Sequence, residues 1–273
     1  MVSKYSLLGV SITTSTKKII LSFCSSVFSK RSKHIRMFPI TIVTPNAEQI
    51  VLASHNENFR LILNSADIAL PDGVGVVWGI RQLSVINRQA PDDVKPVSRH
   101  QIAVSRISGV DFMVDLCGVA SEKNQRVLLY GGRGGIAGKA LEHLQKQYPR
   151  LQGMAQDGME FSGSDTFIDK TMIDSLVQTI RSRNIRIMFI GLGAPKQEYL
   201  LSLLEKRLQG EPVILMAVGG AFDMIAGKII RAPKIVQNLG FEWLWRLIQE
   251  PWRWKRQRAL MTFLRMVILK KFF

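Results

Sequence analysis

Asp72, in the string LPDG, is the carboxylate with the clearest chemical use in this chain. A carboxylate at the floor of a crevice can act as a general base, taking the proton from a hydroxyl that attacks a substrate. Aspartate is also a common helix N-cap, where its side chain accepts a backbone N–H. The residue type and its place before Gly73 leave both interpretations open.

Three glycine-rich strings have the composition of phosphate-binding turns. GGRGGIA contains Gly132, GLGAPKQE contains Gly193 and Gln197, and AVGGAFD contains Asp223. Glycine lets backbone N–H groups approach a pyrophosphate at the start of a helix. The first string loosely matches a dinucleotide fingerprint, but Arg150 lies near the place of the acidic residue expected about 20 positions on. Close packing of a strand against a helix explains each turn alone, whereas the three together favour a nucleotide diphosphate.

Four polar residues are candidates for contact with a substrate. Thr44 and Asn46, in the string TPN, could hydrogen-bond a sugar or cap a helix that starts near Ala47. Asp223 could bind a nucleoside base or its ribose, or stabilise its own turn. Lys196 could offset phosphate charge, and a solvated lysine is an equal alternative.

The sequence lacks the motifs of several kinds of nucleotide and metal site. There is no Gly-Lys-Ser/Thr loop of a P-loop ATPase, and no Asp-x-Asp pair to hold a metal beside a nucleotide sugar. The four histidines lack the spacing of zinc ligands. We therefore expect no metal site and no cofactor. Cys24 and Cys117 have no catalytic neighbours, and we expect both to be free core residues.

An alternation of strand-like and helix-like segments must position these residues. Apolar runs predict strands over 5–12, 37–43, 68–70, 126–130, 185–190 and 213–218. Helical patterns lie around 16–29, 47–64, 109–122, 135–147, 167–183 and 196–208. This order predicts an α/β fold with a Rossmann-like, mostly parallel sheet flanked by helices. Ligands bind such sheets at the carboxyl ends of the strands, where the strings above are placed.

Two regions break the alternation. Residues 84–105 have prolines and mixed charges, which indicate a loop that could cover a site. Composition changes again at 231–273, where four of the five tryptophans fall within 12 residues. We expect two parts: an α/β catalytic domain over 1–230 and a C-terminal helical appendage over 231–273.

The net charge of +16 is concentrated at the two ends of the chain. Residues 1–40 carry 7 basic and no acidic residues, 231–273 carry 10 basic and 2 acidic, and the rest is nearly neutral. A uniformly basic nucleic-acid binder does not have this distribution, which indicates a surface facing something anionic. No apolar run is long enough to span a bilayer.

The sequence of the appendage predicts two helices that meet at a hinge at Pro251. In the second, one polar stripe consists of Lys255, Arg258, Thr262 and Arg265, and the opposite face consists of Leu260, Phe263, Leu264, Val267 and Ile268. Basic residues beside an apolar stripe, with tryptophans nearby, suit a helix that lies in a membrane interface. The same pattern suits an amphipathic helix packed on its own domain or on an oligomer partner.

Taken together, the strings resemble the WecG/TagA/CpsF family of bacterial glycosyltransferases. The resemblance runs from LLGVSI to about Arg258, and its segments are TPN, LPDGVGVV, RISGVDF, GLGAPKQE, GGAFDMIAGKIIRAP and LGFEWLWRLIQEPWRWKR. It implies an inverting, metal-independent enzyme that moves a sugar from a UDP-sugar to a polyprenyl-diphosphate-linked sugar. It also implies a cytoplasmic protein held peripherally on the inner face of the plasma membrane.

The resemblance assigns roles on the acceptor side and at the reaction centre. Asp72 would be the catalytic base, and Thr44 and Asn46 would line the acceptor sugar pocket. Arg106, in RISGVDF, would bind charge near the leaving diphosphate. Family members often have glutamate before this arginine, where Ser105 stands here, so the identity of the acceptor stays open.

On the donor side, the resemblance gives Gln197 a donor contact and Asp223 a nucleoside contact. Arg246, Arg253 and Arg256 match arginines of the family's appendage that would close over the site and stabilise departing UDP. Guanidinium groups suit this task because their donors match phosphate oxygens and remain charged.

Two other classes of protein remain as alternatives. One is a nucleotide-dependent oxidoreductase on a similar fold, and the other is a basic nucleic-acid-binding module. The sequence leaves the donor sugar open among N-acetylmannosamine, its uronic acid and related hexoses. It also leaves open a homo-oligomer.

Overall fold

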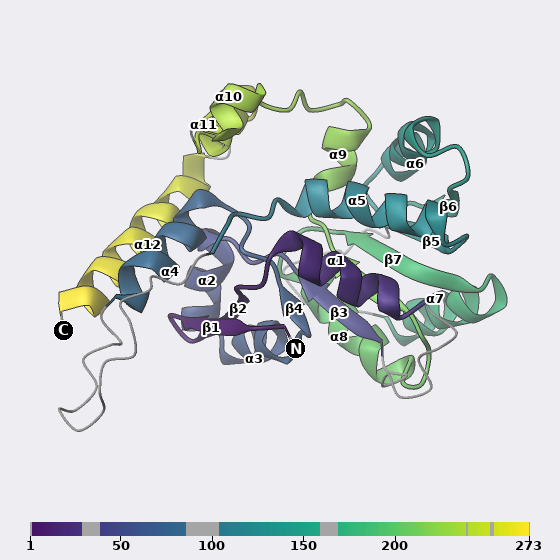
Figure 1. The fold of residues 1–273 in the computed structure, drawn as a ribbon, viewed down its shortest axis with the longest axis horizontal. Helices are drawn as coiled ribbons and strands as arrows, with labels where there is room; N and C mark the ends of the chain where they lie inside the picture. The colour runs from purple at the N-terminus through teal and green to yellow at the C-terminus, as the bar shows by residue number, and fades with distance from the viewer. Residues whose placement is uncertain are drawn as a thin grey trace.

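A six-stranded sheet forms the centre of the molecule, and all its strands run parallel (Figure 1). The computed structural model describes residues 2–28, 39–85, 104–158, 169–238, 240–251 and 254–272. The strand order is β4-β3-β8-β7-β5-β6. The strands are β3 (Ile40–Val43), β4 (Ile68–Ala69), β5 (Arg126–Gly131), β6 (Gln152–Gln156), β7 (Ile185–Gly191) and β8 (Ile214–Ala217). The predicted fold class is confirmed.

Helices cover both faces of the sheet, which explains the continuous apolar runs of the strands. Along β5, Val127 and Leu129 belong to one buried cluster, while Leu128 and Tyr130 belong to the other. The first cluster contains side chains of α1 (Lys17–Ser26), α5 (Gly109–Glu122), α6 (Ile136–Gln147) and α9 (Ala221–Ile225). The second contains side chains of α2 (Ala47–His55), α3 (Glu57–Ser65), α4 (Val74–Ser84), α7 (Lys170–Ser182) and α8 (Lys196–Arg207). Cys24 and Cys117 are buried and free, as expected.

The single strand expected over 5–12 is wrong. The segment forms an antiparallel hairpin of β1 (Lys4–Leu7) and β2 (Val10–Thr13), outside the main sheet. Leu8 and Gly9 have φ of 50° and 85° at the turn. Positive φ at both central residues is typical of the tight turns that connect the two strands of a hairpin through a two-residue loop.

One further element prediction is corrected, two elements were missed, and one predicted loop is largely untested. The helix expected over 47–64 is two helices, because Asn56 is extended and caps α3 by accepting the N–H of Phe59. Helix α4 and edge strand β6 are missing from the predicted ranges, although a helix after Asp72 was implied by its interpretation as an N-cap. The loop expected over 84–105 lies largely outside the described residues, which stop at 85 and resume at 104.

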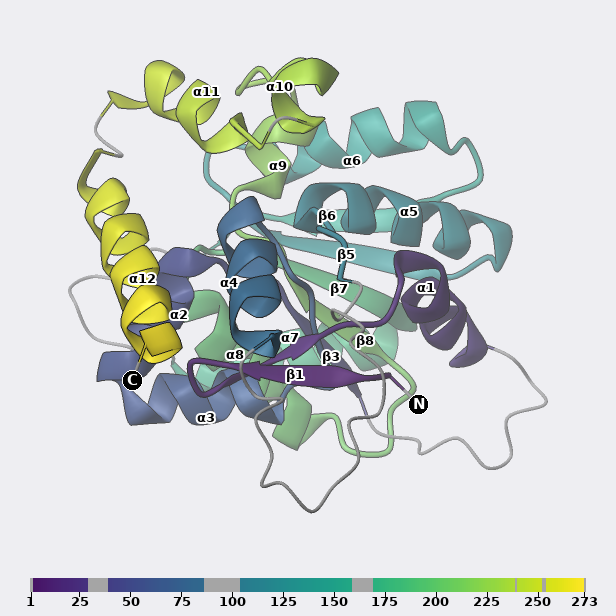
Figure 2. The same cartoon turned by 60° about the vertical axis from the view of Figure 1, so that its left-hand side comes forward.

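The C-terminal segment contains α10 (Lys234–Asn238), α11 (Glu242–Gln249) and α12 (Trp254–Phe272). Figures 1 and 2 show α12 lying alongside α4 and α2. Phe263 and Val267 of α12 are fully buried within the core cluster of α4. A carbon placed as a side chain on Gly79 of α4 would lie 3.0 Å from Phe263 Cζ, so glycine permits the close approach. The alternative that this helix packs on its own domain is confirmed for this face.

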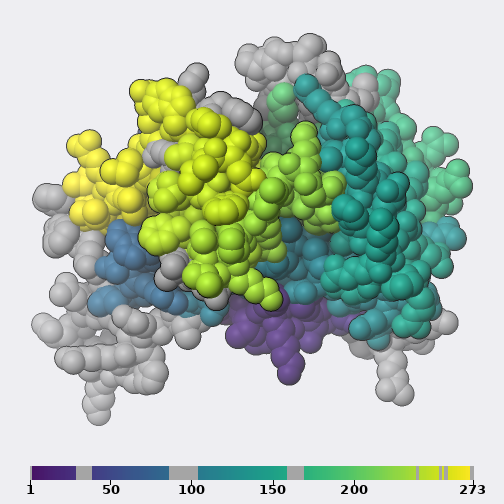
Figure 3. Space-filling view, turned by 90° about the horizontal axis from the view of Figure 1, so that it is seen from above, coloured from purple at the N-terminus to yellow at the C-terminus, as the bar shows by residue number. Residues whose placement is uncertain are grey.

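Helices α10 and α11 lie over the same edge of the molecule as α9 (Figure 1). Seen from that side in Figure 3, the yellow-green side chains of this segment spread over the body of the molecule. Among the described residues, no helix combines the length and apolar character needed to cross a membrane.

Candidate functional site

Asp72 lies at the carboxyl end of β4, immediately before α4. The N-cap of α4 is Gly73, with φ of 107° and no side-chain cap, so the interpretation of Asp72 as that cap is wrong. Its carboxylate instead faces the first turn of α5, where it accepts a hydrogen bond from the N–H of Gly109. Asp72 Oδ2 would lie 3.4 Å from a side-chain carbon placed on Gly109, so little space separates the carboxylate from α5.

The surroundings of Asp72 tune its basicity. Burial raises the pKa of this carboxyl to about 6, with the positive charge of Arg106 acting in the opposite direction and the negative charge of Glu242 adding to the rise. A general base works best when its pKa lies near the operating pH. Asp72 therefore combines a position at a strand end with a pKa suited to accepting a proton near neutrality.

Thr44 and Asn46 follow β3, the strand next to β4. Thr44 is 8% exposed, and its Cγ2 would lie 3.0 Å from a side-chain carbon on Gly109, so Thr44 and Asp72 border the same glycine. Thr44 Oγ1 donates to the carbonyl of Ala217 in β8 at 3.4 Å. The exposed Asn46 caps α2, because its Oδ1 accepts the N–H of Gln49 at 3.0 Å.

A network of opposite charges joins Arg106 to the C-terminal segment. Arg106 forms a salt bridge with Glu242 of α11. Glu242 also lies 3.4 Å from Arg231 Nε, and Arg231 binds Asp111 of α5 with distances of 2.5 and 2.7 Å. Arg106 Nε is buried without a hydrogen-bond partner. These contacts seat α11 on the side of the molecule that carries Asp72.

Sequence reasoning missed Glu242 and Arg231 as site residues. Both stand in strings quoted above, GGAFDMIAGKIIRAP and LGFEWLWRLIQEPWRWKR. The usable signal was the position of Glu242, one of only two acidic residues among ten basic ones over 231–273. An isolated carboxylate in a basic segment is a candidate ion-pair partner.

Arg246, also on α11, reaches the turn that follows β8. Its Nη2 would lie 2.8 Å from a side-chain carbon on Gly220, and its Nε donates to Glu250 at 2.9 Å. The structure thus brings one of the three predicted appendage arginines to the carboxyl edge of the sheet. Arg253 lies outside the described residues, as does the side chain of Arg256.

The turn after β7 contains Gly193 and Gln197. Gly193 has φ of 78°, which favours glycine. Gln197 is 2% exposed; its Oε1 accepts the N–H of Gly219 at 2.9 Å and its Nε2 donates to Glu198 at 2.7 Å. The amide of Gln197 is therefore used within the protein, where it joins the loops after β7 and β8.

Asp223 follows β8, and Gly132 follows β5. Asp223, in α9, pairs with Lys228 at 3.3 Å. Four steps of strand spacing, about 19 Å, separate the end of β4 from that of β5. In the glycine turn after β5, the N–H of Gly135 donates to Asp157 at 2.8 Å. A protein carboxylate thus uses one amide of the turn that the sequence predicted for phosphate.

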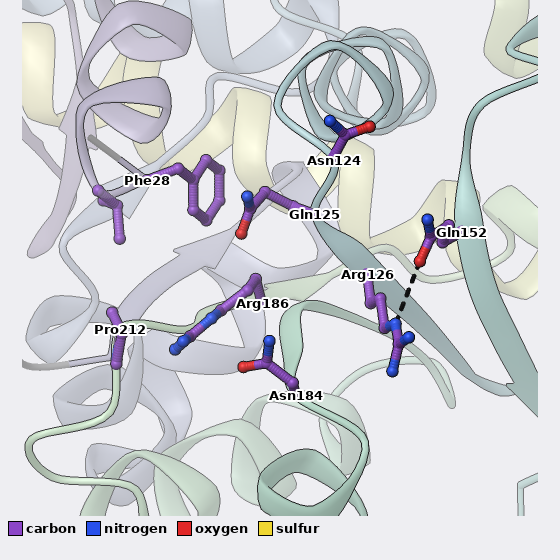
Figure 4. A pocket seen from close by; sticks show the side chains of 9 residues that line it. Phe28, Asn124, Gln125, Arg126, Gln152, Asn184, Arg186 and Pro212 are labelled. Carbon is purple, nitrogen blue, oxygen red and sulfur yellow. Dashed lines mark hydrogen bonds between the residues drawn. The ribbon is translucent and has the colours of Figure 1, made fainter. Parts of the chain in front are cut away.

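A cavity of about 510 Å³ lies at the amino ends of the strands, opposite the ends that carry Asp72 (Figure 4). Its walls include Arg126 at the start of β5, Gln152 at the start of β6 and Arg186 near the start of β7. Arg126 Nε donates to Gln152 Oε1 at 3.2 Å across one wall. Because none of the predicted site residues lines it, this cavity is separate from the site around Asp72.

A second cavity, of about 220 Å³, lies between α5, α6 and α9 and reaches Arg231. No group of three or more His, Cys, Asp or Glu side chains that could hold a metal ion occurs in the part of the chain that the structure describes.

The comparison with protein families agrees with this arrangement. The model of the Glycosyl transferase WecG/TagA/CpsF family matches residues 5–273. The match includes both the sheet with Asp72 and the C-terminal helices with Glu242 and Arg246. Of the three classes of function left open by the sequence, it supports the glycosyltransferase.

Proposed function

The chain belongs to the glycosyl transferase WecG/TagA/CpsF family and is a glycosyltransferase of cell-envelope polysaccharide biosynthesis. From this premise we propose that it moves a sugar from a UDP-sugar to a polyprenyl-diphosphate-linked sugar, with inversion and without a metal ion. The observation that carries the proposal is the Asp72 carboxylate, which lies at a strand end, borders Gly109 together with Thr44, and has a pKa raised to about 6.

In the proposed reaction, ionised Asp72 accepts the proton of the acceptor hydroxyl. The hydroxyl oxygen attacks the anomeric carbon from the face opposite the UDP oxygen, and the bond to UDP breaks. A single displacement inverts the anomeric centre. Thr44 and Asn46 follow the neighbouring strand and are proposed to line the acceptor pocket. Thr44 borders Gly109 together with Asp72, and Asn46 lies two residues after Thr44, at the start of α2.

The leaving UDP gains negative charge, which the arginines are proposed to stabilise. Arg106 lies close enough to Asp72 to lower its pKa, and Arg246 lies over the turn at Gly220. Arg253 and Arg256 are proposed to add to this charge. Arg106 is held by Glu242, so binding of a diphosphate would exchange one anionic partner for another.

The donor side is proposed to lie along the ends of β7 and β8. Gly193 and Gln197 shape the turn after β7, and Asp223 follows the turn after β8. Gln197 is proposed to act on the donor through the turn that it holds at Gly219. Asp223 is proposed to contact the nucleoside, and Gly132 to contact the donor from the next strand end.

The direct test is a screen of UDP-sugars with a short-chain polyprenyl-diphosphate-sugar acceptor. The donors are UDP-N-acetylmannosamine, its uronic acid and UDP-glucose, and the configuration of the new linkage is determined by NMR. We expect one donor to react with inversion. Retention of configuration, or reduction of a nicotinamide cofactor in place of sugar transfer, would contradict the proposal.

The pH dependence of kcat/KM for sugar transfer is expected to reflect the ionisation of Asp72. Because the ionised carboxylate is the base, kcat/KM should rise with pH through about 6. Glu242→Gln removes a negative charge that raises this pKa, so the rise should move to lower pH. Glu57→Gln, an exposed carboxylate on α3, is the control and should leave the profile in place. A profile unmoved by Glu242→Gln would contradict the assignment of the rise to Asp72.

The C-terminal helices are proposed to bind the anionic inner face of the plasma membrane. They expose large apolar side chains, namely Trp243, Leu244, Ile248, Trp254, Met261, Ile268 and Leu269. Cationic residues are abundant in the same segment, with ten over 231–273. Apolar burial at the interface and attraction to anionic lipid act together in such helices.

Ile248→Glu should weaken membrane binding, because it places a charge where a 69% exposed apolar side chain would enter the interface. We expect co-sedimentation with phosphatidylglycerol-containing vesicles to fall several-fold. Leu61→Glu, which changes an exposed side chain of α3, is the matched control and should sediment like the wild type. Equal loss in both variants, or none in either, would place the lipid contact elsewhere.

A further inference from the structure

A chain of hydrogen bonds, buried at its centre, runs across the carboxyl ends of three strands. The N–H of Asn46 donates to Gln49 Oε1 at 3.0 Å, and Gln49 Nε2 donates to Glu198 Oε1 at 2.8 Å. Gln197 Nε2 donates to the same oxygen at 2.7 Å, and Gln197 Oε1 accepts the N–H of Gly219 at 2.9 Å. The loops after β3, β7 and β8 are therefore joined through a single carboxyl oxygen.

The burial of Glu198 favours the neutral form of its carboxyl group. The residue is 0% exposed, and its Oε2 has no hydrogen-bond partner. The side chains that act on it, Gln49 from α2 and Gln197 from α8, are uncharged. Burial raises the pKa of Glu198 to about 7, against the effect of these hydrogen bonds. A proton on Oε2 leaves Oε1 as the acceptor for both amides.

This acceptor fixes how the two glutamines are turned. Each amide must point its Nε2 at Glu198, so each Oε1 must face the other way. One Oε1 is thereby presented to Asn46 at the start of α2, and the other to Gly219 after β8. Asn46 lies on the proposed acceptor side and Gly219 on the proposed donor side.

We propose that Glu198 is a positioning residue of the transferase site, which holds the acceptor-side loop and the donor-side turn in register through Gln49 and Gln197. The proposal rests on the proposed function, which identifies the loop at Asn46 as the acceptor side and the turn at Gly219 as the donor side. It predicts that a substitution at Glu198, which is proposed to contact neither substrate, affects the reaction of both the donor and the acceptor.

The first experiment measures amide hydrogen exchange in the full-length protein and does not depend on activity. Glu198→Leu removes the acceptor of both glutamines. We expect exchange to quicken at least tenfold at both 44–50 and 217–221. The first segment contains Gln49, which is 149 residues from Glu198 in the sequence, and the second follows α8. Glu205→Gln, a half-buried carboxylate farther along α8, is the matched control and should leave both segments unchanged. Unchanged exchange in Glu198→Leu, or a change in only one segment, overturns the proposal.

The second experiment compares the pH profiles of the wild type and Glu198→Gln. Ionisation places negative charge on the buried, unpartnered Oε2 of Glu198, and solvating that charge requires the site to loosen. Wild-type kcat/KM should therefore fall as pH rises through about 7, whereas glutamine, which has the same size and cannot ionise, should remove this loss. The rise through about 6 that reports Asp72 should remain in both proteins. A wild-type alkaline loss that persists in Glu198→Gln contradicts the proposal.

Thermal unfolding separates failure of this proposal from failure of the proposed function. The folded pKa of Glu198 lies above its ordinary value of 4.5, so its contribution to stability is complete below about 4.5 and is lost as pH rises through about 7. The difference in Tm between the wild type and Glu198→Gln should therefore change across this interval even if no UDP-sugar reacts. A pH-independent difference means that Glu198 is ionised throughout and overturns its role as a neutral acceptor.

Discussion

Asp72→Asn is expected to lower kcat by about 10² to 10⁴, the usual contribution of a positioned general base. Asparagine has nearly the same shape, so Thr44, Gly109 and the start of α5 should keep their places around it. UDP affinity, measured by calorimetry, should stay within a few-fold of the wild type, because the base acts on the acceptor and not on the nucleotide.

Asp174→Asn is the control for this variant, since Asp174 is a half-exposed carboxylate of α7 that pairs with Arg207. Its kcat should equal that of the wild type. Turnover by Asp72→Asn at the wild-type rate would remove Asp72 from the mechanism and leave the raised pKa of its carboxyl without a catalytic use.

Arg106→Ala is expected to lower kcat by about 10² to 10³, similar to the loss of one positioned donor to a developing negative charge. The guanidinium is partly buried, with its Nε unpartnered, so it can offer a donor to a diphosphate without full desolvation at the moment of reaction. Arg106→Lys keeps the charge but not the planar pair of donors, and should fall between the alanine variant and the wild type. Initial rates with saturating donor and acceptor measure the effect.

Arg106 also holds α11 in place through its salt bridge with Glu242, so its catalytic contribution to kcat must be distinguished from this structural one. Glu242→Gln loses the same salt bridge but keeps the arginine, and should retain most of its kcat at pH above 7. If Glu242→Gln and Arg106→Ala lose the same amount of kcat, Arg106 acts only by holding the appendage in place.

The central sheet was predictable because its strands are buried on both faces and read as apolar runs. Helix α4 was not, because Gly75 and Gly79 lower its helical propensity by about 1 kcal/mol each relative to alanine. The reason for these glycines is tertiary: Leu260 and Phe263 of α12 pack directly over them. Strand β6 was missed for the opposite reason, since QGMAQ is an edge strand without an apolar run.

The candidate site was predictable where a residue acts alone and not where it acts through a distant partner. Asp72 could be placed from its position after a strand. The salt bridge between Arg106 and Glu242 joins residues 136 apart, and no local pattern indicates it. Glu198 had a weak local signal, because it stands three positions before Leu201 on the buried side of α8. The membrane role and the remaining donor contacts stay predictions.

The measurement that bears most directly on the proposed chemistry is the rate of sugar transfer by the full-length protein with and without divalent cations. UDP release is followed with the reactive donor from the screen, first in excess EDTA and then with added magnesium or manganese. If arginine side chains stabilise the leaving diphosphate, the rate in EDTA should match the rate with either cation. An enzyme that is inactive in EDTA and recovers with magnesium would show that a cation, and not Arg106 and Arg246, carries the charge of departing UDP.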